Sequence, residues 1–138
     1  MEEIKAMIDA VKNIKHRTII MLLYSTGMRV SEIASLKITD IDSKIMRIKI
    51  VQGKGSKDRF IILSETVLQE LRAYYIIYKP AEYLFNGSCR GKKMSVRNIQ
   101  HTIQITLALI GLSGKNYSVH TIRHSFATHL VDNGTDLH

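Results

Sequence analysis

Most of the chain carries apolar residues at intervals of three and four, the spacing that places them on one face of a helix. Runs of this kind begin at Ile4, Ile19, Val30, Val67, Val96 and Val119. Gly27 and Gly134 follow two of these runs and are expected to end their helices, because glycine readily adopts the left-handed conformation beyond a helix end. Pro80 is expected to end the helix that carries Val67, Leu71, Tyr74, Tyr75 and Tyr78. Ser95 is predicted to cap the next helix at its amino end.

Between residues 45 and 63 the period changes to two, which is typical of strands. The apolar members of the first strand are Met46, Ile48 and Ile50, and the basic ones between them are Arg47 and Lys49. A glycine-flanked basic turn over residues 53–57 leads to a returning strand over residues 59–63, so we expect a β-hairpin with a basic tip. Residues 83–85 are expected to add a short third strand. The predicted fold class is α+β, mainly α-helical with one small antiparallel sheet, in a single domain over residues 1–138.

Composition narrows the class of protein. Hydrophobic residues make up 45% of the 138 residues, which excludes a disordered chain, and no apolar run approaches the length of a membrane span. The first five residues lack the basic start and apolar centre of a signal peptide. Cys89 is the only cysteine, so an internal disulfide is impossible, and the cytoplasm is the expected location.

Charge points towards a polyanionic partner. The chain has 20 Lys and Arg against 12 Asp and Glu, a formal net charge of +8. A positive field of this size favours nucleic acid, although a basic but otherwise ordinary domain has the same composition. An anionic membrane surface fits less well, because the basic residues are spread over loops and helix ends and form no single amphipathic face.

The last predicted helix, over about residues 118–133, places charge beside its apolar stripe. The stripe consists of Val119, Ile122, Phe126 and Leu130. Counting 100° per residue, Arg123 lies about 40° from the centre of the stripe, and His120 is its neighbour one turn earlier. A guanidinium so close to a buried face needs an anionic partner. That partner is either an acidic side chain of the protein or a bound phosphate, which arginine grips with two parallel hydrogen bonds.

Two other segments carry isolated cations. Arg29 directly follows the helix stop at Gly27, where two helices are expected to meet at an angle. Lys54 stands between two glycines at the predicted hairpin tip, from which an ammonium could reach a bound strand. Taken singly, each is as readily a solvated surface residue as part of a site.

Together the three segments resemble the sequence boxes of tyrosine recombinases, most closely Xer-type recombinases and the integrases of phages and mobile elements. The boxes are TGMRVSEIASL at residues 26–36, GKGSKDR at residues 53–59 and HTIRHSFATHL at residues 120–130. They occur in the order and spacing of that family, and the resemblance covers essentially the whole chain.

The resemblance implies a site and a mechanism. It assigns the catalytic roles to Arg29, Lys54, His120 and Arg123. The two arginines would bind the non-bridging oxygens of one DNA phosphate, Lys54 would protonate the departing 5′ oxygen, and His120 would handle the proton of the nucleophile. A tyrosine would attack and store the bond energy as a 3′-phosphotyrosyl link, so that rejoining needs no metal and no cofactor. The neighbouring basic residues expected to contact double-stranded DNA are Lys57, Arg59 and His124.

The family places its nucleophilic tyrosine a few tens of residues beyond the His-x-x-Arg pair, whereas all six tyrosines of this chain precede it. We therefore expect a fragment of a catalytic domain that is unable to cleave DNA, without the amino-terminal DNA-clamping domain and the carboxyl-terminal nucleophile segment. Contacts between protomers are expected in the full-length recombinase.

Three alternatives compete with this interpretation. His120, His124 and His129 could suggest a metal site, but they share no common direction and lack a His-Glu-x-x-His pattern, so no metal is expected. A type IB topoisomerase uses similar chemistry, although the short boxes are those of recombinases. The third alternative is a non-catalytic DNA-binding remnant or regulator derived from a recombinase.

Overall fold

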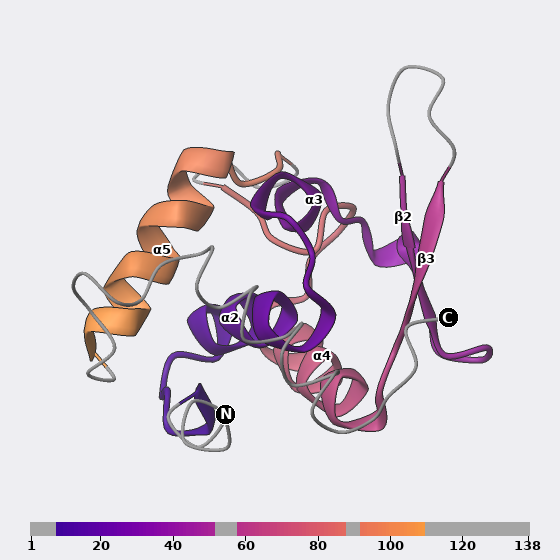
Figure 1. The fold of residues 1–138 in the computed structure, drawn as a ribbon, viewed down its shortest axis with the longest axis horizontal. Coiled ribbons are helices and arrows are strands. Elements are labelled where there is room, and N and C mark those ends of the chain that lie inside the picture. Colours follow the sequence, from indigo (N-terminus) through magenta and orange to yellow (C-terminus); the bar gives the residue numbers. More distant parts are fainter. Residues whose placement is uncertain (1–7, 52–57, 88–91, 110–138) are drawn as a thin grey trace.

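A computed structural model describes residues 8–51, 58–87 and 92–109, and shows a helical body beside a small sheet (Figure 1). Its elements are α2 (Ile14–Thr26), α3 (Val30–Ser35), the 3-10 turn η1 (Ile38–Asp40), β1 (Ile41–Asp42), β2 (Arg47–Ile50), β3 (Arg59–Ile62), α4 (Glu65–Tyr78) and α5 (Val96–Leu109). The fold is α+β with a small antiparallel sheet, as the periodicity predicts. The helix predicted over residues 118–133 lies outside the described residues.

Helix α2 is the centre of the helical body. It contacts α3, α4 and α5, and its residues from Thr18 to Tyr24 are all buried. A helix that is apolar on every side must be covered on every side, which explains why the run beginning at Ile19 lacks a polar face. The Asn13 side chain accepts a hydrogen bond from the His16 N–H (3.0 Å) and caps the amino end. Gly27, with φ 69°, caps the other end as predicted.

Helix α4 buries a narrower face than its apolar composition suggests. Val67, Leu68, Leu71 and Tyr74 are buried, in agreement with the predicted stripe. Tyr75 is 48% exposed, however, because it lies about 100° around the helix from Tyr74 and faces away from α2. The apolar pattern of this helix therefore extends beyond the face that is buried. Tyr78 is 40% exposed, and its ring stacks on that of Tyr74 with the two centroids 4.7 Å apart.

Both predicted boundary signals near these helices are confirmed. Lys79 ends α4 in a left-handed conformation (φ 45°), and Pro80, which has no N–H to continue the ladder, follows directly. At the start of α5 the Ser95 hydroxyl accepts a hydrogen bond from the Asn98 N–H (3.1 Å). The predicted stripe of α5 is buried at Ile99, Ile103 and Leu107.

The sheet has the order β1-β2-β3, with both pairs antiparallel. In the β2–β3 hairpin, Arg47 is opposite Ile62 and Ile50 is opposite Arg59. Ile48 and Ile50 are buried while the intervening basic residues are exposed, which confirms the predicted alternation. Figure 1 shows β2 and β3 side by side next to the helical body.

The third strand is not where the sequence suggested. Residues 83–85 stay outside the sheet, and β1 occupies the third place. Tyr83 forms only an isolated bridge with Lys37, and the Leu84 N–H donates to the Leu36 carbonyl (2.9 Å). Leu84 and Phe85 are both buried, so the apolar character of this segment serves the core of the helical body and not a sheet. None of the helices in the described ranges is long and apolar enough to cross a membrane.

Candidate active site

A rigid corner between α2 and α3 carries Arg29. The Thr26 hydroxyl donates to the Leu22 carbonyl and accepts a hydrogen bond from the Met28 N–H (3.2 Å), so one buried side chain ties the turn to the preceding helix. Met28 is fully buried and anchors the turn in the core. The left-handed Gly27 then reverses the chain direction, as the helix-stop signal predicts. The backbone of Arg29 is thereby fixed on both sides.

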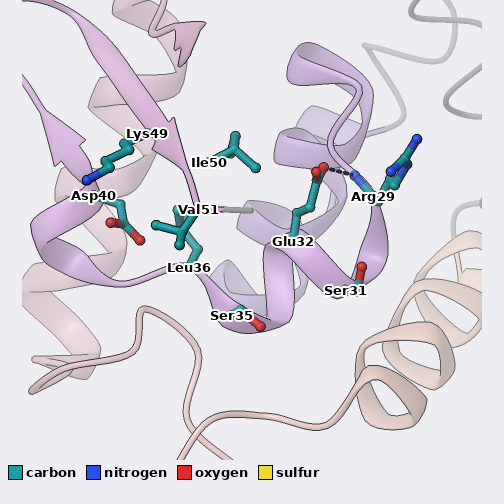
Figure 2. Close-up of a pocket in the computed structure, with 9 residues that line it drawn as sticks. All are labelled: Arg29, Ser31, Glu32, Ser35, Leu36, Asp40, Lys49, Ile50 and Val51. Carbon is teal, nitrogen blue, oxygen red and sulfur yellow. Dashed lines mark hydrogen bonds between the residues drawn. The ribbon is translucent and has the colours of Figure 1, made fainter. Parts of the chain in front are cut away.

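The side chain of Arg29 is exposed and extends away from Glu32 (Figure 2). Among the described residues its guanidinium has no hydrogen-bonded or ion-paired partner. A fixed backbone with a free guanidinium is the arrangement required to grip an external anion with two parallel hydrogen bonds.

Glu32 joins two segments of this region. Its carboxylate Oε1 accepts a hydrogen bond from the backbone N–H of Arg29 (2.8 Å) and another from Nη2 of Arg59 (3.0 Å). The other oxygen, Oε2, accepts from Nη1 of Arg59. Glu32 was not among the predicted site residues, although an acidic residue three positions after a helix start is a recognised signal for this backbone contact.

The ion pair sets the protonation of both partners. Burial by itself would raise the pKa of Glu32, whose side chain is only 9% exposed. The hydrogen bonds from Arg59 and from the Arg29 backbone, together with their charges, outweigh that effect and hold the pKa of Glu32 below its ordinary value. The hydrogen bond to Glu32 likewise raises the pKa of Arg59. The pair is therefore charged on both sides at neutral pH.

A pocket of about 240 Å³ separates α3 from β2. Figure 2 shows Arg29, Ser31, Glu32 and Ser35 on the α3 side, with Lys49, Ile50 and Val51 across from them on β2 and its end. The hollow thus lies between the arginine of the first box and the strand that leads to the second box.

A family model described as the phage integrase family matches residues 1–138. The chain belongs to the phage integrase family.

Relatives within this family include several recombinases. The integrase-family chain is 39% identical to the tyrosine recombinase XerD of Staphylococcus epidermidis over 138 residues, covering 94% of the chain and 46% of that protein. It is 37% identical to the putative integrase/recombinase y4qK of Sinorhizobium fredii, covering 99% of the chain and 44% of that protein. The integrase-family chain therefore spans about half the length of the curated relatives it matches.

Solved structures agree with the fold. The crystal structure of XerA recombinase matches with a TM-score of 0.86 and 31% identity, covering 98% of this chain and 49% of that one. The structure of the XerH site-specific recombinase bound to difH substrate matches with a TM-score of 0.77 and 26% identity, covering 99% and 42% respectively. The fold is therefore that of tyrosine recombinase catalytic domains.

Only part of the predicted site can be placed in this integrase-family chain. Arg29 and Arg59 are described, and they lie on either side of Glu32. Lys54, Lys57, His120, Arg123 and His124 lie outside the described residues. In the described part of the chain no group of three or more His, Cys, Asp or Glu side chains is arranged to hold a metal ion.

Proposed function

We propose that this chain supplies the phosphate-binding part of a site-specific DNA recombinase, which cuts and rejoins duplex DNA in the cytoplasm through a 3′-phosphotyrosyl intermediate. Membership of the phage integrase family over all 138 residues supports this function. The structural observation that carries it is the exposed Arg29 guanidinium, held on a fixed corner and forming no hydrogen bond or ion pair with a carboxylate among the described residues.

Each residue of the proposed site has a separate task. Arg29 and Arg123 bind the two non-bridging oxygens of the scissile phosphate and stabilise the charge that grows in the pentacovalent transition state. Lys54 delivers a proton to the departing 5′ oxygen, and His120 assists the nucleophile or holds the phosphate. The aryl phosphodiester formed with tyrosine conserves the bond energy, so the 5′ hydroxyl can attack it to rejoin the strand.

The rejoining half of this reaction can be tested without a nucleophilic tyrosine. A nicked duplex would carry a 3′-p-nitrophenyl phosphate beside a free 5′ hydroxyl, so that p-nitrophenol stands in for the tyrosine leaving group. The 5′ oxygen forms the new bond to phosphorus, its proton passes to a base, and p-nitrophenolate departs with the electrons of the broken bond. We expect the 138-residue chain to join the strands and to release one p-nitrophenolate for each joint.

Arg29→Ala should slow joining by about a hundredfold or more, the usual loss when one transition-state donor is removed. Arg29→Lys should recover little of it, because one ammonium cannot replace a two-pronged guanidinium. Circular dichroism would confirm that both variants are folded. Joining that is unchanged in a folded Arg29→Ala variant would rule out the proposed phosphate site.

A further inference from the structure

Arg59 begins β3, the strand that returns from residues 52–57. Its two terminal guanidinium nitrogens both bind the carboxylate of Glu32, which lies 27 residues earlier on α3. Such a fork-to-fork contact restricts both distance and orientation, because two parallel hydrogen bonds must form at once. One side-chain pair thereby defines the position, relative to α3, of the turn end of the β2–β3 hairpin, where Ile50 pairs with Arg59.

The same carboxylate also holds the start of α3. Oε1 of Glu32 accepts hydrogen bonds from the Arg29 N–H (2.8 Å) and from Arg59 Nη2 (3.0 Å). One oxygen atom therefore links the backbone of the proposed phosphate-binding arginine to the first residue of β3. Opposite Arg59 on the partner strand is Ile50, which lines the pocket, so the linkage lies at the turn end of the β2–β3 hairpin.

We propose that Arg59 is a positioning residue that, through Glu32, holds the turn end of the β2–β3 hairpin against the start of α3, and that it does not itself bind DNA. For the reaction, this inference rests on the proposed function. If Lys54 protonates the leaving oxygen, the turn end of the two strands must keep a defined relation to Arg29, because small errors in the placement of reacting groups are costly.

The charge of Arg59 argues against its predicted role as a DNA contact. Glu32 neutralises it, and both forked nitrogens are occupied. Arg47, on the neighbouring strand, provides a matched comparison. It is exposed, its guanidinium lies over the Phe60 ring at 4.2 Å, and it has no carboxylate partner among the described residues. Of the two arginines, Arg47 is the one whose charge remains available to DNA.

A positioning role and a DNA-binding role for Arg59 predict different results for a set of three variants. The chain and its Arg59→Gln, Glu32→Gln and Arg47→Gln variants would be compared in duplex DNA binding and in the joining reaction at saturating DNA. Glu32→Gln makes the protein more positive by one charge, so a purely electrostatic effect would tighten DNA binding and leave joining intact. Disruption of the Arg59–Glu32 pair would instead slow joining in both Arg59→Gln and Glu32→Gln.

We expect Arg59→Gln and Glu32→Gln each to lower the saturated joining rate by about tenfold or more while leaving the dissociation constant for DNA within about twofold. Arg47→Gln should weaken binding and leave the saturated rate unchanged. Arg59→Lys, which keeps the charge and loses the fork, should resemble Arg59→Gln. Weakened binding with an unchanged saturated rate in Arg59→Gln, or full activity in Arg59→Lys, would overturn the proposal.

Amide hydrogen exchange separates this inference from the proposed function. Should the unmodified chain join no strands, the proposed function fails, but the positioning role can still be measured. We expect amides of β2 and β3 to exchange about tenfold faster in Arg59→Gln than in Arg47→Gln, with the amides of α2 unchanged. Equal protection of the hairpin in the two variants would refute the positioning role. Thermal unfolding of each variant would show that both are folded at the temperature of the experiment.

Discussion

At the scale of single residues, two arginine side chains of identical chemistry have different roles because they contact different groups. Arg29 and Arg59 both lie beside Glu32, but Arg29 donates its backbone N–H to that carboxylate, and its guanidinium forms no hydrogen bond or ion pair within the described ranges. Arg59 instead donates hydrogen bonds from both terminal guanidinium nitrogens to the carboxylate. The first arrangement suits an external phosphate, and the second fixes two parts of the protein to each other. Assigning roles to basic residues therefore requires knowing which carboxylates they meet.

The stabilising effect of Glu32 should depend on pH. Because its pKa is lowered in the folded protein, its contribution is present above the ordinary value of 4.5 and is lost as the pH falls through the folded-state value. We expect Glu32→Gln to lower the free energy of unfolding by about 1–2 kcal/mol at neutral pH, and by less in acid. Urea unfolding at neutral pH and at about pH 3 would measure this difference.

A matched control is Glu82→Gln, since the Glu82 side chain is 57% exposed and its ion pair with Lys37 is long (3.4 Å). Exposed pairs of this kind contribute little, so the control should unfold like the unmodified chain at both pH values. If Glu32→Gln lowered the free energy of unfolding by the same amount at both pH values, the ion-pair explanation would be contradicted.

Tyr74 provides a second test at this scale. Its hydroxyl is buried and donates to the Leu84 carbonyl (2.8 Å), and burial, followed by the charge of Tyr78, raises its pKa. Tyr74→Phe should lower the free energy of unfolding by about 1 kcal/mol, because the buried carbonyl loses its partner. Tyr75→Phe, at an exposed position of the same helix, should have little effect. Equal stabilities of the two variants in urea unfolding would show that this hydrogen bond contributes nothing.

At the scale of elements, the corner between α2 and α3 brings the first sequence box to a pocket whose other side is formed by β2, the strand that leads to the second box. The corner depends on local backbone geometry, since Gly27 has φ 69° and the Thr26 hydroxyl holds the Met28 N–H. The hairpin depends on a distant ion pair. Local and long-range contacts thus position the two sides of the pocket in different ways.

Gly27→Ala tests the local contribution. A side chain at φ 69° costs about 1–2 kcal/mol, which should appear as a lower free energy of unfolding. Relaxation of that strain would also shift the start of α3, so the variant should join nicked DNA more slowly than the unmodified chain. Ser25→Ala, in the last turn of α2 where alanine suits the helix, is the control and should retain stability and joining. Unchanged stability in Gly27→Ala would show that the corner tolerates another conformation.

At the scale of the whole molecule, the net charge of +8 should govern DNA binding. Binding that neutralises phosphates releases counterions, so affinity falls steeply as salt rises. We expect weak binding with little sequence preference, and a loss of at least about tenfold in affinity between roughly 50 and 200 mM salt. Fluorescence anisotropy with two unrelated duplexes would measure both properties. Affinity that is independent of salt would contradict a phosphate-dominated interface.

Covalent capture of DNA by this chain alone provides a further test. Tyr24 and Tyr74 are buried, and Tyr75 and Tyr78 lie on α4, whereas the candidate phosphate site lies between α3 and β2. None of these four is placed as a nucleophile for a phosphate at Arg29. With a nicked suicide substrate, we expect no covalent protein–DNA adduct from the 138-residue chain. An adduct mapped to any tyrosine of the chain would contradict this assignment.

The sequence by itself determined the elements and the family of this protein. Helical spacing, the shift to a period of two, and end signals such as Gly27, Pro80 and Ser95 act over a few residues, so they can be interpreted without knowledge of the rest of the chain. The structure confirms the predicted helices and the hairpin strands where it describes them, and corrects the strand predicted over residues 83–85. The three boxes were sufficient to place the chain among integrases, and the family match agrees. The roles of Arg29, Lys54, His120 and Arg123 remain predictions.

Only the tertiary structure decided the features that depend on residues far apart in sequence. The pairing of Arg59 with Glu32 spans 27 residues, and no periodicity indicates which carboxylate a given arginine meets. Likewise, the apolar character of Leu84 and Phe85 fits a strand or a core segment equally well, and the packing of the helical body selects the latter. The physical reason is the same in both cases. Helices, strands and turns follow from the backbone geometry of a few neighbouring residues. Which side chains meet across long sequence separations depends instead on how the whole chain folds back on itself.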